Sequence, residues 1–189
     1  MAIKKLVPGD VGRVAGPWAV AFQPGRGAPA STTMATLTPL DASAEPGIKY
    51  FSGVASYTSR FTAPRGWKPG QPLWLDLGEV SELAEVWVNG KLAGTAWHAQ
   101  YRVDVSAATK PGANRLEIKV ANLWVNRLIG DAQPGATKLT WTALPTYRAD
   151  APLGADRAGD LAGSGAITDR RGDVRQSAST SDCQSNRRH

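Results

Sequence analysis

One short stretch of the chain carries three side chains of the kind that bind sugars. In TAWHAQYRVDV, Trp97, His98 and Tyr101 lie close together. An aromatic face packs against the C–H face of a pyranose ring, while neighbouring polar groups hydrogen-bond its hydroxyls. The same residues also suit a loop that closes one end of a domain or faces a neighbouring domain. Trp97, His98 and Tyr101 are therefore the first candidates for carbohydrate binding.

A second group of polar and aromatic residues follows in NLWVNRLIGD, where Asn122, Trp124, Asn126 and Arg127 precede Asp131. Asparagine amides and the planar guanidinium of arginine suit the recognition of sugar hydroxyls. The alternative is a rigid loop in which asparagines bond to backbone groups and Arg127 pairs with Asp131. Residue types leave both interpretations open, so Asn122, Trp124, Asn126 and Arg127 are the second set of carbohydrate-binding candidates.

The acidic residues are not arranged for glycoside hydrolysis. That reaction needs two carboxyl groups flanking the scissile bond, roughly 5–10 Å apart. Glu79, Glu82 and Glu85 lie together in GEVSELAEVW, but glutamates in a turn lack the apolar pocket that a catalytic acid needs. We expect these three residues on a solvated turn and on the outer face of a strand.

No other catalytic apparatus is visible in the sequence. The chain has two histidines, His98 and His189, and a single cysteine, Cys183. These residues exclude an internal disulfide and a cysteine-based zinc site, and no G-x-S-x-G nucleophile elbow is present. We therefore expect no catalytic residue, no metal site and no cofactor in this chain.

The composition argues against two classes of partner. Of the 189 residues, 42% are hydrophobic, which is ordinary for a globular domain, and no run approaches the roughly 18 apolar residues of a membrane span. The net charge of +6 invites a nucleic-acid function, but the basic residues are scattered without a stripe. We expect neither nucleic acid nor membrane as a partner.

The first residues also lack the apolar core of a secretory signal, which leaves the compartment unknown.

The strands that would position the candidate residues are marked by apolar side chains at every second position. The alternation occurs in GPWAVAF and in five further segments after Tyr50. Period two at short spacing indicates antiparallel strands with one buried side, and no segment shows a convincing 3.6-residue period. Residues expected to face the core after Tyr50 are Ala55, Tyr57, Ser59, Phe61, Leu73, Leu75, Leu77, Ala84, Val86, Val88, Tyr101, Val103, Val105, Leu116, Ile118 and Val120.

Turn signals separate these segments. Asn89-Gly90 directly follows AEVWV, and both residues tolerate positive φ, which makes the pair a strong hairpin signal. RGWKPGQP and TKPGAN carry Pro-Gly turns, and QPGRGAPASTT is typical of a loop. Strands and turns together predict an all-β sandwich of the jelly-roll kind over residues 16–150, preceded by an N-terminal extension of residues 1–15.

The segment from Ser56 to Asn122 resembles the sugar-binding domain of family 2 glycoside hydrolases. The shared pattern is LDLGEV, AEVWVNGKLAG, an aromatic-bearing strand, and then KPGANRLEIKVAN. The flanks GPWAVAFQPGRGAP, GIKYFSGVASYTSRF and NLWVNRLIGD look closest to the C-terminal region of family 106 α-L-rhamnosidases. The resemblance covers about residues 16–150 and implies a galactose-binding-like jelly roll. In these families catalysis resides in a large separate domain, which this chain cannot hold beside the sandwich.

The tail from Ala151 to His189 differs from the rest of the chain. It has no aromatic residue and few large aliphatic residues, so it cannot bury enough apolar area to offset its ordering entropy. We expect it to be disordered. Rhamnosidase-like chains end with a final apolar strand of the GLLGPV type, which is missing here. A frameshift in GC-rich coding DNA would explain both features, so residues 151–189 are interpreted as a candidate frameshift product.

Three functions follow from these observations. The first is a non-catalytic carbohydrate-binding or accessory module, a fragment of an α-L-rhamnosidase-like glycoside hydrolase. Its partner would be carbohydrate or the catalytic domain of the parent enzyme, which the resemblance places in the periplasm or outside the cell. The second is a free-standing, lectin-like carbohydrate-binding protein. The third, a small glycosidase in its own right, is disfavoured because paired catalytic carboxylates are missing.

Overall fold

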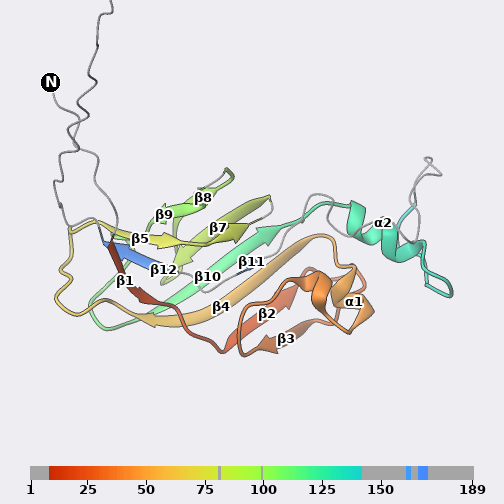
Figure 1. The fold of residues 1–189 in the computed structure, drawn as a ribbon, viewed down its shortest axis with the longest axis horizontal. Helices are drawn as coiled ribbons and strands as arrows, with labels where there is room; N and C mark the ends of the chain where they lie inside the picture. Colours follow the sequence, from red (N-terminus) through yellow and green to blue (C-terminus); the bar gives the residue numbers. More distant parts are fainter. Residues whose placement is uncertain (1–8, 81, 99, 142–160, 163–165, 170–189) are drawn as a thin grey trace, which may run out of the picture.

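A computed structural model describes residues 9–80, 82–98, 100–141, 161–162 and 166–169 (Figure 1). In these residues the chain forms two antiparallel β-sheets packed around one core, with a separate two-stranded pair. The all-β jelly-roll sandwich predicted from the sequence is confirmed. None of the helices in these ranges is long and apolar enough to cross a membrane.

The larger sheet has the strand order β3-β2-β4-β10-β7-β8. The two long central strands, β4 and β10, pair along their whole length, so each presents one continuous face to the core. The bounds are β2 Trp18–Phe22, β3 Ser31–Met34, β4 Val54–Thr62, β7 Leu83–Val88, β8 Lys91–Ala96 and β10 Ala113–Ala121.

The smaller sheet has the order β1-β12-β5-β9 and covers the other side of the core. Its strands are β1 Gly9–Arg13, β5 Leu73–Asp76, β9 Arg102–Asp104 and β12 Ala166–Asp169. The separate pair consists of β6 Glu79–Val80 and β11 Leu161–Ala162. The helical segments are η1 Leu40–Ala42, α1 Pro46–Lys49 and α2 Val125–Asp131, and Figure 1 shows α1 and α2 at the same end of the molecule.

The residues predicted to face the core do so. All of them are buried except Tyr101, which is half-buried and packs against the same cluster. Val86, Val88 and Ile118 are completely inaccessible to solvent. Burying such a side chain stabilises the fold by roughly 1.5–3 kcal/mol, so the apolar face of each strand turns to the core. The alternation of apolar residues is therefore enough to predict which face of a strand is buried.

The turn after β7 shows why an Asn-Gly pair ends that strand. Asn89 has φ 53° and Gly90 has φ 81°, as a two-residue hairpin turn requires. The Asn89 amide nitrogen donates to the Asn114 side chain at 2.8 Å and to the Ala108 carbonyl at 2.9 Å. Its amide oxygen accepts the backbone N–H of Arg115 at 3.1 Å. Asn89 therefore ties the β7–β8 hairpin to the start of β10.

Two segments differ from the sequence-based expectation. QPGRGAPASTT is typical of a loop, yet its last three residues begin β3, an edge strand with the sequence STTM. That strand lacks alternating apolar residues, so period two could not reveal it. Similarly, α2 occupies part of NLWVNRLIGD, which the sequence suggested to be a loop. Seven residues are only about two turns of helix, too few to show a 3.6-residue period.

The sandwich also extends beyond the predicted range of residues 16–150. β12 pairs with β1 on one side and β5 on the other, so it is an inner strand of the smaller sheet. The segments 161–162 and 166–169 therefore form strands within the region that the sequence suggested to be a disordered tail. Backbone pairing on both sides of β12 supplies an ordering contribution that side-chain composition does not reveal.

The other residues of the tail, Cys183 and His189 among them, lie outside the described residues. The division into residues 1–15, 16–150 and 151–189 and the frameshift origin of the tail stay predictions.

Candidate functional site

The fold brings the two groups of candidate residues to the same end of the larger sheet. β7 pairs with β8 on one side and β10 on the other, and the register aligns Ala96, Ala84 and Val120 in one row. β8 and β10 therefore run in the same direction, and Trp97 and Asn122 leave the sheet at the same end. The two strands are about 10 Å apart, because neighbouring strands lie about 4.8 Å from each other.

In the first group, Trp97 and His98 are exposed and Tyr101 is half-buried. Trp97 is 69% exposed, and its ring meets that of His98 edge-on, with centroids 5.2 Å apart. Tyr101 packs against the core, and its carbonyl accepts the Leu77 N–H at 2.8 Å. Trp97 and His98 thus present their side chains to solvent, while Tyr101 contributes to the edge of the sandwich.

Apolar side chains continue from Trp97 across this end of the sheet. Val54 pairs with Ala121, which pairs with Leu83, and Trp97 follows β8 beside Leu83. Five large side chains, which we call the apolar edge, are each at least 38% exposed. They are Val54, Leu83, Trp97, Leu123 and Trp124. Contiguous exposed apolar groups of this kind mark contact surfaces.

Asn122 secures the backbone at this edge. Its amide nitrogen donates to the Phe51 carbonyl at 2.8 Å, and its amide oxygen accepts the Gly53 N–H at 2.7 Å. The hydroxyl of Ser52, between these two residues, accepts the backbone N–H of Arg127 at 2.9 Å. Asn122 therefore follows the alternative raised by the sequence, in which asparagines bond to backbone groups and hold a rigid segment.

Trp124 and Asn126 have different environments. Trp124 is 57% exposed, and the Arg26 guanidinium lies over its ring at 4.7 Å from the centroid, a cation–π contact. Asn126 is 5% exposed, and its amide oxygen accepts no hydrogen bond from the described part of the chain. Trp124 is therefore largely exposed at this end of the sheet, whereas Asn126 is buried.

Arg127 and Asp131 form the predicted ion pair. Arg127 Nε lies 2.9 Å from Asp131 Oδ1, and the two side chains are only 8% and 6% exposed. Asp131 Oδ2 accepts three further hydrogen bonds, from the backbone of Leu139 and from the backbone and hydroxyl of Thr140. Burial raises the pKa of Asp131, but the bonds from Thr140 and Leu139 and the charge of Arg127 outweigh it. The pKa of Asp131 therefore lies below its ordinary value of 3.8.

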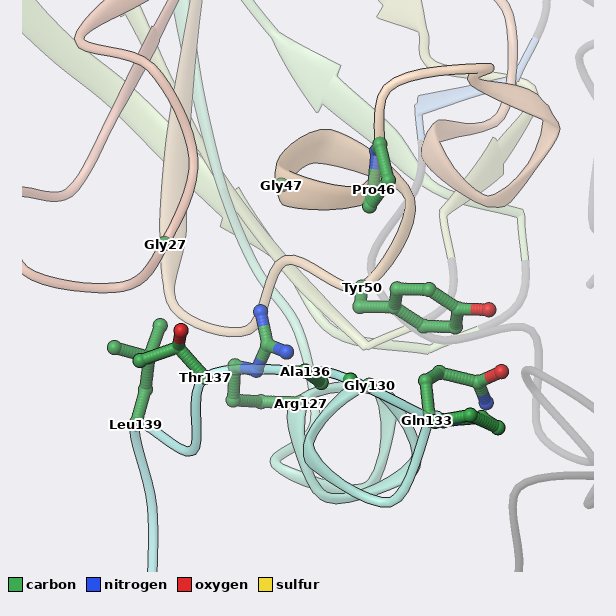
Figure 2. A pocket seen from close by; sticks show the side chains of 12 residues that line it. Gly27, Pro46, Gly47, Tyr50, Arg127, Gly130, Gln133, Ala136, Thr137 and Leu139 are labelled. Atoms are coloured by element: carbon green, nitrogen blue, oxygen red, sulfur yellow. The ribbon is translucent and has the colours of Figure 1, made fainter.

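A pocket of about 600 Å³ opens beside Arg127 (Figure 2). Three segments line it: the loop after β2, the region of α1, and α2 with the turn that follows. Figure 2 shows the Arg127 guanidinium between the α1 region and α2, with Tyr50 on one side and Leu139 on the other. Sequence reasoning missed Tyr50 and Leu139 because neither belongs to a chemical motif, and only folding places them beside Arg127.

The glutamates considered for catalysis lie apart from this pocket. Glu85 is on the outer face of the larger sheet, where its carboxylate accepts the Trp87 Nε1–H at 3.2 Å. Lys119 Nζ lies 4.7 Å from the centroid of the Trp87 ring, so Trp87 packs among its neighbours on the outer face of the same sheet. No cluster of His, Cys, Asp or Glu in the described ranges could hold a metal ion.

A comparison with known families identifies the type of domain. The model of the glycosyl hydrolase 2 galactose-binding domain-like family matches residues 46–149, more than half of the chain. The chain belongs to this family. The resemblance of this galactose-binding-like domain to family 2 glycoside hydrolases, drawn from its strand and turn motifs, is therefore confirmed.

Relatives of the domain are much longer proteins. A rhamnosidase from Novosphingobium sp. PP1Y is 54% identical with a TM-score of 0.82, over 89% of this chain and 16% of the enzyme. A putative β-glucuronidase from Formosa agariphila is 55% identical over 86 residues, 45% of this chain and 7% of the relative. A β-glucuronidase from Ruminococcus gnavus, 19% identical with a TM-score of 0.57 over 84% of this chain and 28% of that one, shares the fold alone.

Proposed function

We propose that this chain is a non-catalytic accessory module of an α-L-rhamnosidase-like glycoside hydrolase. The observation that carries the proposal is its match to the Novosphingobium rhamnosidase. At 54% identity the match extends over 89% of this chain but only 16% of that enzyme. A domain that makes up so small a part of a relative is expected to support the activity of the rest rather than to perform it.

The arrangement of carboxylates supports a non-catalytic role. Hydrolysis of a glycoside requires two carboxyl groups that flank one bond. The buried carboxylate of Asp131 accepts four hydrogen bonds, so its oxygens are engaged within the fold. Glu85 lies on the outer sheet face, away from the pocket. The described residues thus offer no pair of carboxyl groups around a ligand site.

The apolar edge is the surface that we assign to the partner, which is carbohydrate or the catalytic domain of the parent enzyme. Exposed tryptophan is enriched where proteins bind sugars and other proteins, because its large ring buries much area with little loss of conformational freedom. Trp97, His98 and Trp124 would contact the partner directly. The side chains that would support this surface from beneath are Tyr101, Asn122, Asn126 and Arg127.

Complementation tests this proposal. The segment of the Novosphingobium rhamnosidase that matches this chain is deleted, and the isolated chain is added to the remainder. We expect the chain alone to leave an aryl α-L-rhamnoside intact and to restore activity or solubility to the truncated enzyme. Hydrolysis by the chain itself, or a truncated enzyme that never responds to it, would refute the accessory role.

A second function, a free-standing carbohydrate-binding protein, is favoured by one specific observation. The pocket beside Arg127 is bounded by an aromatic ring and a buried guanidinium, which are groups that bind sugars in proteins. Glycan-array binding by the isolated chain, without any effect on the truncated rhamnosidase, would identify this function in place of the accessory one.

A further inference from the structure

The guanidinium of Arg127 has a free edge that faces the pocket. Its Nε donates to Asp131 at 2.9 Å, whereas Nη1 and Nη2 donate to no acceptor among the described residues. The side chain is 92% buried, since 8% of it is exposed, and it lines the pocket. A buried arginine normally has all of its donors satisfied by protein, water or ligand. Neither terminal nitrogen is among the fully buried polar atoms that lack a partner, so both remain accessible from the pocket and can take an acceptor from outside the chain.

Glycines keep this edge uncovered. A Cβ atom at Gly130 would lie 2.5 Å from Nη2 and 2.5 Å from Tyr50 Cβ, and one at Gly27 would lie 3.0 Å from Nη1. Real Cβ atoms do not approach other atoms to 2.5 Å, and a contact of 3.0 Å is tighter than most, so a larger residue at either position would displace the guanidinium or fill the space around it. The close approach of three chain segments around Arg127 thus depends on two positions without side chains.

Two basic residues, Lys49 and Arg26, are chain neighbours of the pocket-lining residues Tyr50 and Gly27. Lys49 Nζ lies 5.7 Å from the centroid of the Tyr50 ring, and Tyr50 lines the pocket. Arg26, next to Gly27, lies over Trp124. The acidic groups nearby are Asp131, whose oxygens are engaged, and Glu45, which precedes α1. This local balance favours an anionic ligand over a neutral one.

We propose that the pocket binds a sugar acid, a uronate, with its carboxylate on the Nη1–Nη2 edge of Arg127. Two parallel N–H groups of a guanidinium match the two oxygens of a carboxylate, which gives a bidentate, charge-assisted pair. The ring of Tyr50 provides an aromatic wall for the pyranose, and a volume of about 600 Å³ accommodates a sugar of this size. This inference rests on the carbohydrate-binding role proposed above and specifies the sugar class.

An NMR titration of the full ¹⁵N-labelled chain tests the inference. The probes are the methyl glycosides of D-glucuronate and D-galacturonate, with the neutral methyl glucoside and galactoside as matched controls and sodium acetate as a carboxylate without a sugar. We expect at least one uronate to shift the Arg127 Nε–H signal and to bind roughly tenfold or more tightly than its neutral counterpart. Equal binding of acid and neutral sugar, or no binding of either uronate, would overturn the inference.

Variants separate a loss of binding from a loss of folding. Arg127→Lys keeps the charge but removes the fork, so uronate affinity should fall roughly tenfold or more. Thr137→Glu adds a carboxylate at an exposed position of the pocket lining and should weaken uronate binding in a chain that folds normally. The matched control is Thr62→Glu, at an exposed position outside the pocket. Unchanged uronate affinity in Thr137→Glu would contradict the proposed site.

The same experiment distinguishes a sugar carboxylate from a protein carboxylate. If the natural occupant of the pocket is an Asp or Glu side chain of an attached domain, acetate should bind as tightly as the uronates, and that result would overturn the sugar assignment. The complementation assay reports on the accessory role separately. Restored rhamnosidase activity without preferential uronate binding would refute this inference and leave the accessory role standing.

Discussion

The carboxylate of Asp131 lies 2.9 Å from Nε of Arg127 and holds that guanidinium by a single nitrogen. Its second oxygen accepts hydrogen bonds from Leu139 and Thr140, in the segment that follows α2. One acidic residue therefore connects α2, the following segment and the arginine of the pocket. Its burial and its bonds make Asp131 a sensitive position for both stability and ligand binding.

Asp131→Asn preserves the shape of this side chain but removes its charge. We expect the free energy of unfolding to fall by roughly 3–5 kcal/mol, because the variant leaves the buried guanidinium without its counter-charge. Urea denaturation at neutral pH measures the loss. The matched control is Asp76→Asn, which breaks a more exposed pair with Arg102 and should cost at most about 1 kcal/mol. Equal losses at the two positions would contradict the role of burial.

The stability of the domain should also depend on the ionisation of Asp131. Its pKa in the folded chain lies below the ordinary value of 3.8. The unfolded chain therefore takes up the proton first, and the contribution of Asp131 is present above pH 3.8 and lost as the pH falls through the folded-state pKa. The difference in unfolding free energy between the wild type and Asp131→Asn should stay constant from pH 7 to pH 5 and shrink below pH 4. A difference that does not change down to pH 3 would contradict this assignment.

The face assignment of the central strands is tested by truncating core residues. Val88→Ala and Ile118→Ala should each lower the free energy of unfolding by roughly 1–4 kcal/mol, because burial is lost and a cavity remains. Leu92→Ala, at a position that is 45% exposed, is the control and should have a much smaller effect. Neutral results at both Val88 and Ile118 would place them on the solvent face, since a one-residue register slip exchanges the two faces.

The apolar edge should matter more for partner contact than for folding. Trp97→Ala and Trp124→Ala should impair complementation of the truncated rhamnosidase while keeping the melting temperature within a few degrees of the wild type, because both rings are mostly exposed. Trp141→Ala, which removes an 86% exposed ring outside this edge, is the matched control. Unfolding of the Trp97 and Trp124 variants would assign both rings to the stability of the fold instead.

The role of β12 can be tested by shortening the chain. A chain that ends at Asp150 lacks β12 and leaves β1 and β5 without the strand between them, so it should melt at a lower temperature and aggregate through its open edges. A chain that ends at Arg170 retains β12 and should behave like the 189-residue chain. Equal thermal stability of the two chains would show that residues 161–169 do not stabilise the sandwich.

The architecture of the sandwich is predictable from local patterns in the sequence. Successive side chains of a strand point to opposite faces, so the alternation of Val86 and Val88 with Glu85 and Trp87 identifies the buried side before any partner strand is known. The Asn89-Gly90 turn is likewise a local property, because it depends on two residues that tolerate positive φ. The fold class and the core residues could therefore be predicted without knowing which distant segments of the chain pack together.

The candidate site was predictable only in part. Its residue types drew attention to Trp97, Trp124 and Arg127, and the Arg127–Asp131 pair belonged to one of two alternatives that the residue types left open, a rigid loop rather than the helix that forms. The engagement of Asn122 with Phe51 and Gly53 was one of two alternatives, and the sequence had no means of choosing between them. Which polar side chains are engaged in backbone bonds depends on which distant segments pack against them.

Tertiary structure alone decided the pocket and the last strand. Arg127 and Gly27 are far apart in the sequence, and they line one cavity because three connecting segments meet at the end of the sheet where β10 ends. β12 has a composition typical of disorder, yet it pairs on one side with β5, which also pairs with β9, and on the other side with β1. Composition and periodicity describe a segment by itself, whereas burial of a guanidinium and closure of a sheet depend on long-range pairing that no local pattern encodes.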